Sequence, residues 1–139
     1  MISYQYEADF KLGDDVKYTD WINNIVRGEQ WELGDLDYVF CTDDYLYSLN
    51  EKYLGHKTYT DIITFDYSED NTVSGEIYIS VDRVKENAKR YNVDFDIELQ
   101  RVMAHGLLHL MGFNDKTDKE KELMRDKESE KINLFHVKQ

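Results

Sequence analysis

The segment that most restricts the fold of this chain lies between residues 96 and 115. Val102 to Asn114 is the longest stretch without Asp, Glu, Lys or Arg, and it contains two histidines. Apolar or small residues recur through this region at the spacing of one helical face, namely Leu99, Val102, Met103, Gly106, Leu107 and Leu110. Such an unbroken stripe predicts a helix over 96–111 that packs against a core. Ala104 and Leu108 extend its apolar surface, so we expect the helix to be buried on nearly every side.

His105 and His109 are four residues apart and therefore share one face of this helix. That face lies roughly 110° from the centre of the apolar stripe, at about 100° per residue. Two imidazoles one turn apart can chelate a metal ion, and a catalytic zinc takes three protein ligands and keeps one open position. Gly112 can end the helix and turn the chain back, which brings Asp115 within reach. We predict His105, His109 and Asp115 as ligands of one Zn²⁺, with other divalent transition metals as alternatives.

The alternative is that the two histidines bind no metal and are ordinary surface polar residues or hydrogen-bonded buried side chains. Short motifs of this kind carry a real risk of false positives. The motif also differs from a peptidase helix, in which a glutamate directly after the first histidine serves as general base. Gly106 occupies that position here. Glu76 and Asp61 are the candidate bases, and the sequence does not choose between them.

The remaining periodicities predict a mixed sheet packed with helices, of the α+β or α/β-like class. Residues 2–10 alternate between apolar and polar side chains, as a half-buried strand does. Further strands are expected at 37–42, 61–67 and 76–80, and helices at 15–27, 43–53, 81–91, 96–111 and 118–135. Within the second helix, Leu46, Leu49 and Tyr53 are expected to point inward. The charged mixture of the last helix is typical of a solvated helix.

The charge balance restricts the class of partner. The chain has 17 basic and 29 acidic residues, a net charge of −12, which argues against a sequence-blind polyanion binder or a membrane-surface domain. A single cysteine, Cys41, excludes an internal disulfide. The amino terminus lacks the pattern of a secretory signal, and no apolar stretch is long enough to cross a bilayer. We therefore expect a cytoplasmic protein with no membrane association. Most of the 11 tyrosines are expected at core or boundary positions, although tyrosines can stack on unpaired bases.

Three blocks of sequence resemble the YbeY family of bacterial endoribonucleases and rRNA maturation factors. The family's metal helix reads His-Gly-x-Leu-His-Leu-x-Gly-Tyr-Asp-His, and the matching residues are His105, Gly106, Leu108, His109, Leu110 and Gly112, with Phe113 a close substitute. Upstream, the family's Leu-Asn and Thr-Asp-Val-Leu-Ser-Phe blocks are similar to Leu49-Asn50 and to Thr60-Asp61-Ile62-Ile63-Thr64-Phe65. Its Gly-Asp-Ile-x-Ile-Ser strand is similar to Gly75-Glu76-Ile77-Tyr78-Ile79-Ser80.

The resemblance covers essentially the whole chain and implies a fold and a function. The fold is α+β: a single metallohydrolase domain over residues 1–139, with a four-stranded mixed sheet, about five helices and a metal helix similar to that of zincins. The implied activity is zinc-dependent, single-strand-specific endoribonuclease action in small-subunit rRNA maturation and ribosome quality control. The implied partners are ribosomal RNA and the small ribosomal subunit, with ribosomal proteins or GTPases as candidate protein partners.

Three residues depart from the family pattern. Asp115 stands where the family has its third histidine ligand, and Asn114 stands where it has an aspartate. Leu54 replaces a basic arginine that is thought to contact the phosphate, so His56 and Lys57 become candidate substrate-binding residues. Two alternatives follow. One is a ribosome-assembly binding factor with a mainly structural metal and little nuclease activity. The other is a metallohydrolase of small molecules or peptides, which Gly106 disfavours.

Overall fold

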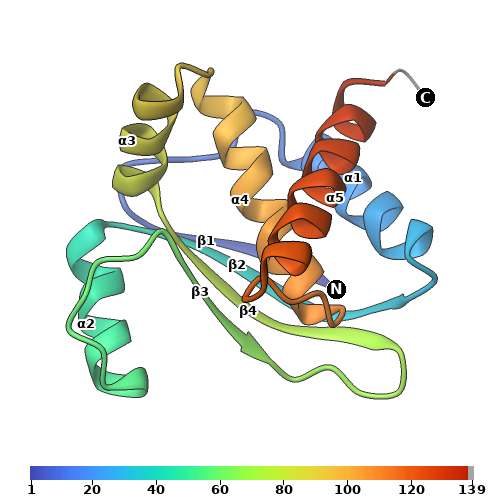
Figure 1. The fold of residues 1–139 in the computed structure, drawn as a ribbon, viewed down its shortest axis with the longest axis horizontal. Helices are drawn as coiled ribbons and strands as arrows, with labels where there is room; N and C mark the ends of the chain where they lie inside the picture. The colour runs from blue at the N-terminus through green and yellow to red at the C-terminus, as the bar shows by residue number, and fades with distance from the viewer. Residues whose placement is uncertain (138–139) are drawn as a thin grey trace.

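The computed structural model describes residues 1–137, and the order of its strands and helices is the order that the sequence predicts. The four strands form one sheet, and most of the helices lie on one side of it (Figure 1). The elements are β1 (Ile2–Glu7), α1 (Asp15–Gly28), β2 (Glu32–Cys41), α2 (Asp43–Leu54), β3 (Ile62–Asp66), β4 (Thr72–Ser80), α3 (Val81–Tyr91), α4 (Phe95–Leu110) and α5 (Asp118–His136). The prediction of a single α+β domain with a four-stranded mixed sheet and five helices is confirmed.

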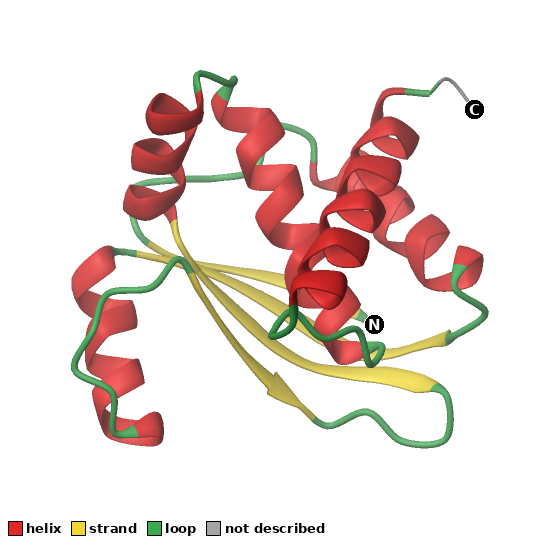
Figure 2. Ribbon diagram, in the orientation of Figure 1, coloured by secondary structure: helices red, strands yellow, loops and turns green. Residues whose placement is uncertain are grey.

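The sheet has the strand order β1-β2-β4-β3. The pairs β1–β2 and β2–β4 are parallel, and β3 runs antiparallel to β4 at the edge. The sheet forms a layer under α1, α3, α4 and α5 (Figure 2). The second helix packs on the other face, where Leu46 joins Cys41 and Ile63 in a small separate apolar cluster. The two faces of β3 and β4 therefore have different neighbours, and this difference decides which of their side chains can reach the metal helix.

The metal helix α4 lies at the centre of the helical layer, between α3 and α5 (Figure 1). Its predicted apolar stripe is confirmed, since Leu99, Met103 and Leu107 are at most 1% exposed. Ala104 and Leu108 are also fully buried. His105 and His109 are therefore among the few partly exposed side chains in the second half of α4.

Two strands begin earlier than their apolar residues suggest. Strand β2 starts at Glu32 and β4 at Thr72, because the first residues of the two strands pair with each other. The pairing shifts register between Leu33 and Leu36, which marks a bulge. Gly75 occupies a core-facing position in β4, against Leu110, so the strand lacks an apolar side chain at that step of its alternation.

Two smaller expectations were wrong. Strand β1 ends at Glu7 rather than at residue 10, although Phe10 still packs on the core with its ring centroid 5.2 Å from that of Phe40. Tyr53 does not point inward, because its side chain is 57% exposed. Its ring makes a T-shaped contact with Phe65, and Nζ of Lys52 lies 5.2 Å from its centroid. In the part of the chain that the structure describes, no helix is both long and apolar enough to cross a bilayer.

Candidate metal centre

The three predicted ligands come together at the end of α4. His105 and His109 lie one turn apart on the same face, and Gly112 follows the helix with a φ of +90°. Only glycine adopts this conformation at no steric cost, and here it turns the chain back toward the histidines. Asp115 then lies beside both imidazoles, so that all three ligand atoms are within 4.8 Å of one another.

The distances among these atoms fit a single tetrahedral ion. The two Nε2 atoms are 3.0 Å apart. The Asp115 Oδ2 atom lies 3.3 Å from Nε2 of His105 and 3.4 Å from Nε2 of His109. Ligand bonds of about 2.0–2.1 Å in tetrahedral zinc place neighbouring ligand atoms about 3.3 Å apart. The residues present therefore fit a three-ligand site of the His₂Asp type, with a fourth position left for water or substrate.

A buried carboxylate orients the first histidine. Nδ1 of His105 lies 2.6 Å from Oε2 of Glu128, a residue of α5 that is 5% exposed. Arg101 donates from Nη1 to the other oxygen of this carboxylate, at 3.1 Å. A proton held on Nδ1 leaves Nε2 free to bind a metal ion, and metal-ligating histidines commonly have such a carboxylate partner.

The charge around His105 favours its protonated form while no cation is bound. Burial by itself lowers the pKa of His105. The hydrogen bond and charge of Glu128 outweigh burial, helped by the charges of Asp115 and Asp61, and the pKa is raised above 6.5. The same negative charges would stabilise a bound divalent cation in place of the proton.

A polar pocket of about 310 Å³ opens beside the ligands. Its walls come from α3, α4 and α5, and the start of β3 contributes Asp61 and Ile62. The residues that line it are Asp61, Ile62, Asn87, Tyr91, Glu98, Arg101, Val102, His105, Asp115, Arg125 and Glu128. Burial raises the pKa of Asp61, although the neighbouring His105 opposes the shift. A carboxylate of this kind, next to metal ligands, suits proton transfer.

The structure separates the two candidate bases. In β4, Ile77 and Ile79 join the main core under α4, whereas Tyr78 packs on the α2 side. Because side chains alternate along a strand, Glu76 lies on the α2 side with Tyr78. Only Asp61 lines the pocket beside the ligands.

The two candidate substrate-binding residues lie on a neighbouring surface. His56 and Lys57 are exposed in the loop after α2. His56 lines a hollow of about 400 Å³ that also includes Leu54, and this hollow shares Ile62 with the metal pocket. Neither His56 nor Lys57 lines the metal pocket itself. The structure therefore does not place them beside the predicted ligands.

Sequence reasoning missed Arg101 of α4 and the contributions of α5, of which Glu128 is the most important. The signal was present, because the buried residues of α5 are Met124, Glu128, Lys131 and Ile132, which are spaced as one helical face. Two of the four positions carry charges. A charged residue at a core position of a helix needs a partner, so Glu128 was identifiable as a paired group even though its partner was not.

Gly106 shows why the peptidase arrangement is absent. A Cβ atom at this position would lie 2.8 Å from Cδ1 of Ile62 and 2.9 Å from Cγ2 of Ile77. The helix approaches β3 and β4 too closely there for any larger side chain without repacking. A glutamate at position 106 could not act as a base.

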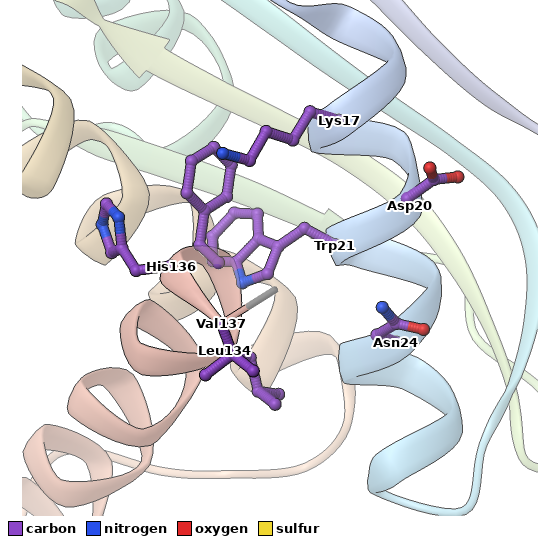
Figure 3. A pocket seen from close by; sticks show the side chains of 8 residues that line it. Lys17, Asp20, Trp21, Asn24, Leu134, His136 and Val137 are labelled. Carbon is purple, nitrogen blue, oxygen red and sulfur yellow. The ribbon is translucent and has the colours of Figure 1, made fainter. Parts of the chain in front are cut away.

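A second cavity, of about 520 Å³, lies between α1 and the end of α5 (Figure 3). Its lining is partly aromatic, and Nζ of Lys17 lies 4.6 Å from the centroid of the Phe135 ring. The potential metal ligands in its lining are one histidine, His136, and one carboxylate, Asp20. Among residues 1–137, three such ligands converge only at His105, His109 and Asp115.

Comparisons with known proteins agree with this geometry. The family model described as Endoribonuclease YbeY matches residues 4–136. A protein of Flavobacterium johnsoniae named endoribonuclease YbeY is 50% identical over 139 residues, which cover the full length of both chains. One of Christiangramia forsetii with the same name is 51% identical, covering 99% of this chain and 96% of its own.

A solved structure is similar in fold. The solution structure of a Thermotoga maritima protein has a TM-score of 0.71 and 29% sequence identity, and the match covers 97% of this chain and 89% of that protein. The two sequence relatives match this chain over all or nearly all of its length, and the fold is the one that the resemblance implied. The chain belongs to the YbeY family of endoribonucleases.

Proposed function

We propose that this protein is a zinc-dependent endoribonuclease that cleaves single-stranded RNA at the pocket beside His105, His109 and Asp115. The observation that carries the proposal is the convergence of these three ligand atoms, in a chain whose full-length relatives are named endoribonucleases. The pocket of about 310 Å³ is at the small end of ligand sites. It suits a single extended strand better than a duplex.

In this proposal each residue has a defined part. His105, His109 and Asp115 hold the ion, and Glu128 keeps the proton of His105 on Nδ1. A divalent ion bound there supplies an activated water and neutralises charge that develops on the phosphate. Asp61 accepts a proton from the attacking water at a carboxylate oxygen, for which its raised pKa is suited.

The biological setting is proposed from the family resemblance. We propose that the substrate is ribosomal RNA of the small subunit, and that the protein acts in rRNA maturation and ribosome quality control in the cytoplasm. Ribosomal proteins or GTPases are the proposed protein partners.

One experiment tests the enzymatic proposal. Wild type, His109→Ala and, as a control, His136→Ala are purified in parallel and assayed for metal content by elemental mass spectrometry. Each is then assayed on single-stranded and duplex RNA. We expect about one equivalent of metal and single-strand cleavage for wild type and His136→Ala, and neither for His109→Ala. Stoichiometric metal in His109→Ala would show that the ligand assignment is wrong.

Two observations support a second candidate function. Leu54 is 48% exposed in the place of the family's arginine, and the net charge is −12. Both weigh against phosphodiester cleavage, and so keep the alternative of a ribosome-assembly binding factor in which the metal is structural. Co-sedimentation of His109→Ala with small ribosomal subunits tests it. Persistent association, together with absent cleavage by the metal-loaded wild type, would support the binding role over the enzymatic one.

A further inference from the structure

The metal pocket also has lining residues outside the predicted ligand set. Among them, α3 contributes Asn87 and Tyr91, and α5 contributes Arg125. We propose that these residues form a subsite for one nucleotide of single-stranded RNA, in which Tyr91 stacks on the base and Arg125 contacts a phosphate. The inference rests on the proposed function, because it assumes that RNA enters this pocket.

The spacing of Asn87, Tyr91 and Arg125 along their helices agrees with their lining the same cavity. Asn87 and Tyr91 are four residues apart on α3 and so share the face that borders the pocket. Arg125 is three residues before Glu128 on α5 and shares its face in the same way. Since α4 lies between α3 and α5 (Figure 1), Tyr91 and Arg125 approach the pocket from opposite walls.

Arg125 is the cation of this pocket that remains available for a ligand. Arg101, the other arginine in the lining, is already bonded to Glu128 and lies 3.4 Å from the Ser129 hydroxyl. Arg125 is exposed and forms no ion pair within residues 1–137. It is close enough to the buried Glu98 to favour the ionised form of that carboxyl. The charge of its guanidinium therefore acts on the pocket, although no ion pair within the described residues holds it in place.

The pocket needs such a cation if it is to accept a phosphate. Its lining contains four carboxylates, from Asp61, Glu98, Asp115 and Glu128, and only the two arginines. An arginine can bind a phosphate with two parallel hydrogen bonds, so Arg125 can supply this contact in the pocket.

Tyr91 offers the flat surface that an unpaired base requires. It is the last residue of α3 and 52% exposed. Its ring stacks on no other aromatic ring of the described chain, in contrast to the core tyrosines Tyr4, Tyr6 and Tyr38. Exposed aromatic rings beside a cation are the usual means by which proteins bind single strands without reading their sequence.

The two contacts have different signatures in a binding measurement. The probe is a short fluorescent single-stranded oligoribonucleotide, its integrity is checked on a gel, and its affinity is measured by anisotropy at several salt concentrations. Arg125→Gln should lower the slope of log affinity against log salt by about 0.7, the value for one lost phosphate contact on a single strand. Arg125→Lys should keep the slope. Lys119→Gln, which removes an exposed charge elsewhere on α5, should also leave it unchanged.

Tyr91→Ala should weaken binding by about 5- to 150-fold, the equivalent of one lost base stack, at an unchanged salt slope. Tyr91→Phe should bind as wild type does. On a probe whose nucleotides lack bases, Tyr91→Ala and wild type should bind equally. The subsite is wrong if Arg125→Gln keeps the full salt slope or if Tyr91→Ala binds the intact probe normally.

The same proteins separate this inference from the proposed function. If wild type cleaves RNA while both variants bind it normally, the nuclease proposal stands and the subsite is overturned. If both variants show the expected binding signatures but metal-loaded wild type does not cleave, the subsite stands and the nuclease proposal fails.

Discussion

His105 on α4 and Glu128 on α5 are joined by a 2.6 Å hydrogen bond between Nδ1 and Oε2, across 23 residues of sequence. This bond connects the metal helix to the last helix of the chain. It also places the negative charge of Glu128 behind the imidazole. Helix α5 therefore contributes to the candidate metal site through a side chain that is outside the predicted ligand set.

Replacing this carboxylate should weaken metal binding without removing a ligand. We expect Glu128→Gln to lower zinc affinity by about 10- to 100-fold, the usual effect of losing such a partner. Competition with a chromophoric chelator measures the affinity, and circular dichroism checks the fold. Glu130→Gln is the matched control, because Glu130 is on the same helix and its side chain is 55% exposed. Equal zinc affinity in both variants would contradict the role of Glu128.

The two candidate bases can be separated by activity at constant metal content. We expect Asp61→Asn to reduce RNA cleavage by about 100-fold or more, because Asp61 lines the pocket beside the ligands. Glu76→Gln should cleave at the wild-type rate, since Glu76 lies on the other face of the sheet. Rates are compared after metal analysis of each protein. Loss of activity in Glu76→Gln with full metal occupancy would not agree with this geometry.

The third ligand can be tested by deletion and by restoring the family residue. Asp115→Ala leaves two protein ligands and should retain far less metal than wild type, whereas Asp115→His should retain about one equivalent. An imidazole carries no negative charge, so the ion in Asp115→His should be the stronger Lewis acid. Elemental mass spectrometry of the three proteins, purified side by side, gives the result. Full metal content in Asp115→Ala would remove Asp115 from the ligand set.

A buried ion pair away from the site should contribute to stability in a pH-dependent way. Nζ of Lys131, a side chain only 2% exposed, lies 2.7 Å from Oε2 of Glu29. We expect Glu29→Gln to lower the free energy of unfolding by about 2–4 kcal/mol at pH 7, because the buried Lys131 would keep only the carboxylate of Glu130, at 3.3 Å and 55% exposed. Urea denaturation measures the difference. The exposed Glu130→Gln should cost less than about 1 kcal/mol.

The pH dependence of that difference follows from the pKa of Glu29. Burial acts to raise this pKa, but hydrogen bonds from Lys131 and Lys127 outweigh burial, and the pKa is lowered from 4.5. The ionised carboxylate therefore stabilises the fold fully at pH values above the ordinary pKa of a glutamate. This stabilisation is lost as the pH falls through the lowered pKa of Glu29 in the folded protein. The gap between wild type and Glu29→Gln should shrink under acid. A gap independent of pH would point to packing instead.

Because α4 lies so close to the sheet at Gly106, we expect that adding one methyl group there lowers the free energy of unfolding. Gly106→Ala gains helix propensity but places a Cβ atom 2.8 Å from Ile62 Cδ1. The strain of overpacking, typically 1–3 kcal/mol, should exceed the propensity gain and leave a net loss of about 1 kcal/mol. Gly13→Ala is the control, because nothing lies within 4 Å of its added Cβ atom. A stabilised Gly106→Ala would show that the isoleucines move aside freely.

Local periodicity in the sequence determined the elements of the fold and the core of the metal site. The apolar stripe of α4 and the four-residue spacing of His105 and His109 are properties of one helix. The glycine turn that brings in Asp115 follows within six residues. The capping box of Thr117 and Glu120 is equally local, and it is present at the start of α5. Such features depend on neighbours along the chain, so they can be read without knowing the fold.

Only the tertiary structure decided which distant side chains meet at that site. Strand pairing sets the face on which each residue of β4 lies, and this separates Glu76 from Asp61 although both are acidic residues near predicted strands. Helix packing brings Glu128 and Arg125 of α5 to a pocket whose metal ligands end at Asp115. Burial and charge pairing between elements depend on how the helices pack across the sheet. The spacing of residues along a single element does not contain this information.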